Sequence, residues 1–232
     1  SSRISYRAVY WMWHHCLVEH RRLGSLAGNV QERDNMTSLM IFSTALGLYA
    51  LFWAWYVGLG RKISPALLAE VERLMTEDDG GLTDTHKKNV RHFLENDDGK
   101  DFVMVNLLAL KQPRRESLSL LNKYSKVFLG SLLKRAGHPI ARASAAAGKI
   151  EFLNVPEAEE WDAALLVRYR SRRDFAEMII ETWASEHHGF KLAALDRTFA
   201  FPASNWFVLG GPKLLLALVL ALTACVLHIL LS

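Results

Sequence analysis

The sequence predicts an α+β domain flanked by two helices that span a membrane. Two uncharged apolar runs bracket the chain, residues 38–60 and 214–231, of about 23 and 18 residues. At a rise of about 1.5 Å per residue, roughly 20 helical residues cross a hydrocarbon core of about 30 Å. The stretch between the runs is charged and has the helix and strand periods of a small folded domain. We therefore expect an integral membrane protein with two spans, residues 38–60 and 205–232.

Basic residues at the ends of the two runs indicate where the central domain lies. Arg61 and Lys62 follow the first run, Lys213 precedes the second, and no basic residue follows the second. Because cytoplasmic loops carry an excess of Lys and Arg, these flanks place the central domain in the cytoplasm. Arginines before the first run also favour the cytoplasmic side, and they are Arg3, Arg7, Arg21, Arg22 and Arg33. The two ends of a membrane-spanning helix lie on opposite sides of the membrane, so only one of the two basic flanks of the first run can be cytoplasmic.

Residues 1–37 look unlike the rest of the chain, and we treat them as a separate segment that is non-native or poorly ordered. Aromatic, histidine and cysteine residues crowd together in 11–16 without a clear helical or strand period. Met36 opens directly onto the first apolar run, and our hypothesis is that the natural chain starts there. A native mass that includes residues 1–35 would exclude it. No small-residue cleavage site follows the first run, which indicates a retained anchor and not a signal peptide.

Composition and cysteine use exclude several classes of protein. Hydrophobic residues make up 50% of the chain, charged residues 22%, and the net charge is +4, which is typical of a folded protein. Residues 61–213 contain 23 basic and 21 acidic residues, a difference of only +2, so we expect no nucleic-acid partner. The two cysteines, Cys16 and Cys225, lie outside this stretch, which therefore has no disulfide framework or zinc site. We expect no metal and no cofactor.

Residues 61–100 predict two short helices. Ser64 and Pro65 suit the N-cap and first position of a helix that runs to about Met75. The sequence EDDGG breaks this helix, a second helix covers 86–94, and NDDGKD then makes a turn. We interpret the pair as a helical neck between membrane and domain. The alternative is an added layer that packs on the domain.

Residues 101–204 predict four strands and two helices. The strands are FVMVNLLAL (102–110), a strand within 139–155 that ASAAAG interrupts, AALLVRY (163–169) and RTFAFP (197–202). The first helix, 116–136, has one apolar face, formed by Leu121, Tyr124, Phe128 and Leu132, and Gly137 suits its C-terminal cap. Ser171 caps the second helix, whose buried stripe is formed by Phe175, Met178, Ile179, Thr182 and Trp183.

The resulting order, β-α-β-β-α-β, predicts a ferredoxin-like sandwich with two helices on one face of a four-stranded antiparallel sheet. The other sheet face is then uncovered. An apolar open face usually binds a partner, and a second copy of the chain in a face-to-face dimer is the expected one.

Several segments resemble the domain of unknown function 1330 family, which belongs to the dimeric α/β-barrel superfamily. They are FVMVNLLALK, RAGHPI, WDAALLVRYRSRRDFAEMI and HHGFKLAALDRTFAFP, together with Tyr124, and the match covers about 101–202. This chain has Tyr169-Arg170-Ser171 and Gly137-His138 where the family usually has Tyr-Pro-Ser and often two glycines. The wider superfamily includes cofactor-independent monooxygenases, lactone isomerases and haem-handling enzymes. The resemblance implies a pocket between the sheet and its helices.

Asn106, Arg168 and His138 are the candidate ligand-binding residues of such a pocket. Asn106 lies in an otherwise apolar strand, where its amide needs partners. It binds either a substrate or the neighbouring backbone. Arg168 lies between Val167 and Tyr169, where it orients an anionic or carbonyl-bearing ligand or makes an ordinary ion pair.

His188 and Tyr124 are the candidate catalytic residues. Histidine is the natural proton-transfer group near neutral pH, and His138, His187 and His188 are the choices in the domain. Glu186, His187 and His188 have no third ligand at a recognisable spacing, so a metal site is not expected. The alternative for the histidines is a helix-end role, and for Tyr124 it is core packing with the hydroxyl at the rim.

Two classes of function follow. Nucleotide-binding loops, the serine-hydrolase elbow and zincin motifs are absent, and the apolar runs contain no acidic or basic residue. The first class is a membrane-anchored domain that binds or transforms a small lipophilic molecule. The second is a non-catalytic accessory or scaffold subunit of a membrane complex. A deep pocket with convergent polar groups favours the first class, and an interior filled by its own side chains favours the second.

Overall fold

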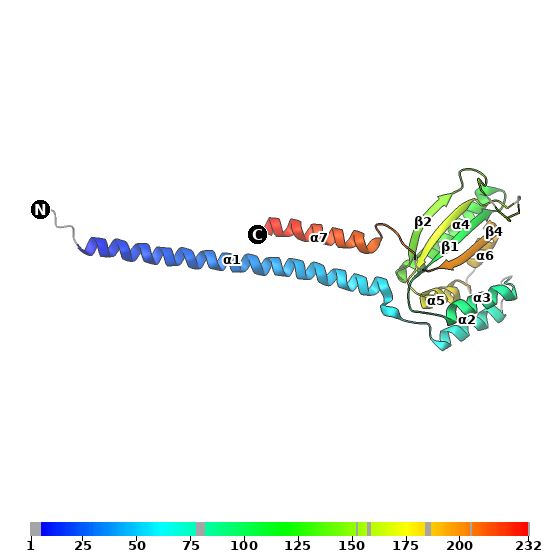
Figure 1. Ribbon diagram of the computed structural model, residues 1–232, viewed down its shortest axis with the longest axis horizontal. Coiled ribbons are helices and arrows are strands. Elements are labelled where there is room, and N and C mark those ends of the chain that lie inside the picture. The colour runs from blue at the N-terminus through cyan, green and yellow to red at the C-terminus, as the bar shows by residue number, and fades with distance from the viewer. Residues whose placement is uncertain are drawn as a thin grey trace. The chain divides into compact units, whose positions relative to one another are not determined.

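The computed structural model describes residues 6–77, 82–151, 153–156, 159–183, 187–204 and 206–231 (Figure 1). The chain divides into two compact units. One unit holds the chain up to Phe52 together with the chain from Leu209 onward, and the other runs from Trp53 to Val208.

The first unit contains one apolar helix and most of the other, whose last residues, from Trp53 to Val57, belong to the second unit. Helix α1 spans Tyr6–Val57 and helix α7 spans Pro212–Leu231. The stretches Gln31–Gly60 and Pro212–Leu231 are long and apolar enough to cross a membrane. Within this unit the two helices meet at Ser38 and His228, where Ser38 Oγ lies 3.0 Å from His228 Nδ1.

Helix α1 begins well before the first apolar run. We recognised no period in residues 1–37, yet the described part of that segment, from Tyr6 onward, is helical. The physical reason is that apolar and charged residues occur there in clusters, such as AVYWMW and EHRR, without a regular repeat, and amphipathic periodicity is the signal on which a helix prediction depends.

A four-stranded antiparallel sheet forms the centre of the second unit. Its strands are β1 (Phe102–Leu110), β2 (His138–Ser144), β3 (Ala163–Tyr169) and β4 (Leu195–Ala203), in the spatial order β2-β3-β1-β4. The described chain departs from the prediction for 139–155, because β2 ends at Ser144. Beyond it Ile150 is 96% exposed and cannot contribute to a core.

Helices α4 (Arg114–Lys134) and α5 (Arg172–Trp183) pack on one face of the sheet. The buried cluster between sheet and helices consists of Phe102, Leu132, Val167, Tyr169 and Met178. A third helix, α6 (His187–Ala194), precedes β4 and packs mainly against α4. The sequence analysis did not predict this helix, because its eight residues include Gly189, which interrupts a helical pattern.

Helices α2 (Pro65–Glu77) and α3 (Asp84–Glu95) pack against α5 (Figure 1). Val71, Met75 and Leu94 are buried together with Ala176 of α5. Ser64 Oγ accepts a hydrogen bond from the Leu67 amide at 3.2 Å, so Ser64 caps α2 as predicted. The two helices form an added layer on the domain, which is the alternative to a neck.

The end of α4 is built differently from the predicted glycine cap. The left-handed residue is Ala136, with φ of 56°, and not Gly137. Gly137 is required for space instead, because a Cβ there would lie 2.4 Å from Leu132 Cδ1 and 2.9 Å from the carbonyl oxygen of Arg168. The glycine therefore lets the end of α4 approach β3 closely.

The sheet face opposite the buried cluster carries exposed aromatic residues. Phe199 and Phe201 of β4 are 54% and 43% exposed. They lie opposite Leu107 and Val105 of β1 in the antiparallel register, so all four side chains belong to the same face. Arg168 also belongs to this face, since it pairs in register with Val103 and His138.

Candidate functional site

The candidate site begins where α1 ends. Gly58, Leu59 and Gly60 all have positive φ, at 77°, 55° and 69°, and form a short 3-10 turn. A Cβ on Gly58 would lie 2.8 Å from Arg170 Cδ, so this position needs glycine both for its φ and for the close approach of Arg170. The turn places the last residues of α1 beside the junction between β3 and α5.

Two arginines from that junction bind the C-terminal carbonyl groups of α1. Arg168 Nη2 donates to the Tyr56 carbonyl at 3.1 Å, and Arg170 Nη1 donates to the Trp55 carbonyl at 3.0 Å. The last four carbonyl groups of a helix have no partner within the helix, and cations are favourable at that end of the helix dipole. The two arginines therefore satisfy polar groups that would otherwise be left unpaired at the domain surface.

Arg168 is 1% exposed and fully committed to partners. Its guanidinium carbon lies 3.8 Å from the centroid of the Tyr56 ring, in a cation–π contact. Its Nε donates to Asp101 Oδ2 at 2.8 Å, and its Nη1 donates to the Ala136 carbonyl at 2.8 Å. Arg168 thus makes the ion pair that was the alternative to a ligand-binding role.

The structure brings His138 to the same place. The Tyr56 hydroxyl lies 2.7 Å from His138 Nε2, and His138 Nδ1 lies 3.0 Å from the Pro139 carbonyl. A carbonyl oxygen only accepts, so Nδ1 carries the proton, and in a neutral ring Nε2 accepts from Tyr56. Arg168 and His138, both predicted site residues, therefore meet at Tyr56, which the sequence indicated only as an aromatic residue of the membrane interface.

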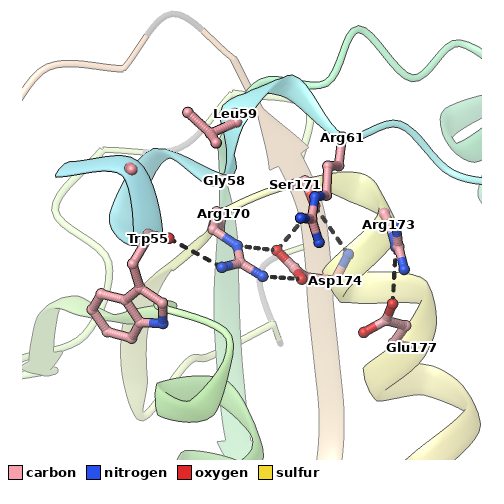
Figure 2. Close-up of a pocket in the computed structure, with 10 residues that line it drawn as sticks. Trp55, Gly58, Leu59, Arg61, Arg170, Ser171, Arg173, Asp174 and Glu177 are labelled. Atoms are coloured by element: carbon pink, nitrogen blue, oxygen red, sulfur yellow. Dashed lines mark hydrogen bonds and ion pairs between the residues drawn. The ribbon is translucent and has the colours of Figure 1, made fainter. Parts of the chain in front are cut away.

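A pocket of about 380 Å³ adjoins this cluster (Figure 2). One wall comes from the end of α1 and the turn after it, and the other comes from the start of α5. The lining residues are Ala54, Trp55, Gly58, Leu59, Arg61, Arg170, Ser171, Arg173, Asp174 and Glu177. One wall is thus mainly apolar, and the other is charged.

The charged wall is ordered by hydrogen bonds that begin at Asp174. Arg170 Nε and Nη2 donate to its two carboxylate oxygens, each at 2.7 Å, and this hydrogen bonding raises the pKa of Arg170. Ser171 Oγ accepts from the Asp174 amide at 3.1 Å, which confirms Ser171 as the cap of α5. Arg173 Nε donates to Glu177 Oε1 at 3.0 Å. Three guanidinium groups face two carboxylates, so the pocket lining has a net charge of +1.

Asn106 lies on the other face of the sheet, toward the buried cluster. Its Nδ2 donates to the carbonyl groups of Met104 and Leu165, each at 3.1 Å. In register Asn106 pairs with Leu165 and Arg168 pairs with Val103, and these two pairs point to opposite faces. Asn106 therefore does not share a site with Arg168 and His138.

Tyr124 and His188 also lie away from the pocket, on α4 and α6. Tyr124 stacks on Phe128 with 5.5 Å between ring centroids, and burial raises its pKa to about 12. Lys191 Nζ lies 6.0 Å from the Tyr124 ring centroid, and burial lowers the pKa of this lysine. The described side chains include no group of three His, Cys, Asp or Glu residues that could hold a metal ion. Glu186 and the side chain of His187 lie outside the described residues.

Comparisons with known proteins do not identify a function for this chain. No family model matches the sequence. No curated protein matches it either. Two crystal structures, of the RPA0582 protein of unknown function from Rhodopseudomonas palustris and of a methylated RPA0582 protein, each have 18% sequence identity and a TM-score of 0.44. They cover 55% and 56% of this chain, and 96% of each of those chains is covered.

Proposed function

We propose that this protein is a membrane-anchored domain of the ferredoxin-like, dimeric α/β-barrel type that binds a small lipophilic molecule in the pocket beside Trp55. The resemblance of residues 101–202 to the domain of unknown function 1330 family supports the fold assignment. The observation that carries the function is the lining of the pocket, in which an apolar wall from the end of α1 faces Arg170, which directly precedes α5, and Arg173 of α5.

The position of the apolar wall in the sequence supports a lipophilic ligand. Ala54, Trp55 and Leu59 belong to the last part of Gln31–Gly60, the first stretch that is long and apolar enough to cross a membrane. In a membrane-spanning helix, tryptophan and tyrosine gather at the level of the lipid headgroups. A pocket at that level is accessible to molecules that partition into the bilayer, and Arg61 and Lys62 favour a cytoplasmic location for it.

The interior of the domain supports the choice of this pocket over a pocket between sheet and helices. The Asn106 amide is bound to backbone carbonyl groups, and Tyr124 packs on Phe128. The space between sheet and helices is filled by the buried cluster around Phe102 and Val167. Binding at the end of α1 requires none of these side chains to move, and we assign no catalytic step to His188 or Tyr124.

The test is native mass spectrometry of the full chain, purified in mild detergent, with one blocking and one control substitution. Ala54→Trp fills the pocket from its apolar wall. Ala50→Trp makes the same change one helical turn earlier, at a residue that does not line the pocket. We expect a retained small molecule in the wild type and in Ala50→Trp, and its loss in Ala54→Trp. Retention by neither wild type nor control, or equal retention by all three, would contradict the proposal.

The open sheet face favours a second candidate function, that of an accessory subunit of a membrane complex. Phe199 and Phe201 expose aromatic surface on this face. Exposed aromatic clusters commonly mark protein contacts, and a second copy of the chain or another membrane subunit would cover them. Copurification of a stoichiometric protein partner, with no retained small molecule, would favour this function over the first.

A further inference from the structure

We propose that the pocket beside Trp55 binds the phosphate ester of an anionic lipid headgroup, and that Arg61 and Arg173 are the residues that hold it. This inference rests on the proposed function, because it names the chemical class of the ligand for the same pocket. The observation that supports it is that the arginines of the pocket lining differ in how many of their hydrogen-bond donors are already used by other residues of the chain.

Arg170 is a structural residue of the pocket. Its Nε and Nη2 bind Asp174, and its Nη1 binds the Trp55 carbonyl. These bonds engage all three of its nitrogens, and they join the end of α1 to the start of α5. Arg170 therefore shapes the pocket, but it has little capacity left for a ligand.

Arg61 and Arg173 have more donors to offer. Arg61 is exposed, and within the described part of the chain it makes no ion pair. Arg173 is 40% exposed, and it uses only Nε in its bond to Glu177. Glu177 also accepts a hydrogen bond from Arg135 at 3.3 Å, so its charge is shared between two arginines. Figure 2 shows Arg61 and Arg173 on the side of the pocket opposite Trp55.

The chemistry of these donors fits a phosphate ester. A guanidinium group presents several N–H donors in a planar fork, and this geometry matches the oxygens of a phosphate group. The net charge of +1 in the lining favours an anion over a neutral or cationic group. The apolar wall of Ala54, Trp55 and Leu59 then faces the uncharged part of the same molecule.

The position of Arg61 favours a lipid as the source of the phosphate. Arg61 directly follows Gln31–Gly60, and Lys62 comes next. Basic residues just outside a membrane span are attracted to the negatively charged surface of anionic lipids. This attraction alone is not specific, so the experiment must distinguish lipid binding in the pocket from lipid attraction to any exposed basic residue.

Lys62→Gln is the matched control for that separation. It removes one positive charge beside Arg61, but Lys62 is exposed and does not line the pocket. The double variant Arg61→Gln/Arg173→Gln removes the proposed ligands and leaves the Arg170–Asp174 pair in place. The conservative variant Arg61→Lys/Arg173→Lys keeps the charge, and it shows whether the glutamine variant fails only because it is misfolded.

The measurement is native mass spectrometry of each full-length protein in detergent with equal amounts of phosphatidylglycerol and phosphatidylcholine. We expect the wild type to retain phosphatidylglycerol preferentially. The preference should fall roughly tenfold in the double glutamine variant, persist in Lys62→Gln and be partly kept in the lysine variant. If glycerol 3-phosphate displaces the lipid, the natural ligand of the pocket is a soluble phosphate ester. If the lipid resists displacement, the natural ligand is a lipid.

An equal loss of preference in Lys62→Gln would overturn the inference, because general surface charge would then explain it. The absence of any preference in the wild type would also overturn it. If a neutral compound is still retained by the wild type and lost in Ala54→Trp, the proposed function stands and only the phosphate inference fails. If the wild type retains no compound at all, both fail.

Discussion

Arg168 lies flat against Tyr56, with its guanidinium carbon 3.8 Å from the ring centroid, and it also donates a hydrogen bond to the carbonyl group of the same tyrosine. The two residues are 112 positions apart in the chain. Their contact joins the last turn of α1 to strand β3. Together with the ion pair to Asp101 and the hydrogen bond to the Ala136 carbonyl, it stabilises a charged side chain at 1% exposure.

Arg168→Met is therefore expected to destabilise the protein strongly. It leaves Asp101 without its buried partner and removes donors from two carbonyl groups. Breaking such a buried pair costs about 3 kcal/mol, which corresponds to a fall of roughly 6–12 °C in melting temperature for a chain of this size. Thermal unfolding of the full chain in detergent measures this. Arg115→Met is the control, because Arg115 is exposed on α4, and a similar fall in both variants would show that Arg168 has no special role.

The hydrogen bond between Tyr56 and His138 predicts a coupling that a double-mutant cycle can measure. Tyr56→Phe keeps the ring over Arg168 and removes only the hydroxyl, which lies 2.7 Å from His138 Nε2. We expect Tyr56→Phe to cost about 1 kcal/mol and to cost much less when His138 is already replaced by alanine. Additive effects of the two substitutions would show that the hydrogen bond contributes no stability.

Glu181 predicts a dependence of stability on pH. Ser131 Oγ donates to Glu181 Oε2 at 2.7 Å, and this hydrogen bond is the main reason that the pKa of Glu181 is lowered from 4.5. A carboxyl group with a lowered pKa in the folded state stabilises the protein above pH 4.5, and this contribution is lost as the pH falls through the folded-state value.

Ser131→Ala should reduce that contribution, with a loss of at most about 1 kcal/mol at pH 7 that shrinks as the pH falls below 4.5. Melting temperatures of both proteins between pH 3 and 7 give the comparison. Ser119→Ala is the control, since Ser119 is exposed on the same helix. A loss for Ser131→Ala that is constant over this pH range would contradict the assignment of the effect to the Glu181 carboxylate.

The exposed sheet face predicts that Phe199 and Phe201 support self-association. Replacing both with serine removes two aromatic side chains from a shared face. If this face holds two copies together, the dissociation constant should rise at least tenfold, because burial of each ring contributes roughly 1.5–3 kcal/mol. Light scattering of the detergent-purified protein measures its oligomeric state. Ile150→Ser changes a more exposed apolar residue outside the sheet, and loss of the dimer in that variant as well would assign the effect to general surface polarity.

Local signals explain which elements could be predicted from sequence. Strand β1 has the predicted bounds because FVMVNLLAL is a continuous apolar run between turn residues. Ser171 could be recognised as a cap because its role depends only on the three residues that follow it. The end of β2 and the separate helix α6 were missed, since small residues and Gly189 weaken the periodic signal there.

The candidate site was predicted only in part, because its contacts join distant parts of the chain. Arg168 and His138 were selected as polar residues near an expected pocket, and they do lie together. Tyr56 connects them, yet in the sequence it is one of several aromatic residues at the end of an apolar run, a pattern typical of a membrane interface. Asn106 was grouped with them although strand alternation directs it to the other sheet face, a distinction that needs the register of β1 and β3.

The central claim is that a lipophilic molecule binds between the end of α1 and the start of α5, and photo-crosslinking tests it most directly. The full chain would be labelled in detergent with a lipid that carries a diazirine near its headgroup, and the labelled peptides would be mapped by mass spectrometry. We predict that labelling concentrates on residues 54–61 and 170–177, and that Ala54→Trp reduces it there while Ala50→Trp does not. Labelling confined to the apolar stretches 38–52 and 214–231, and unchanged by Ala54→Trp, would contradict the claim.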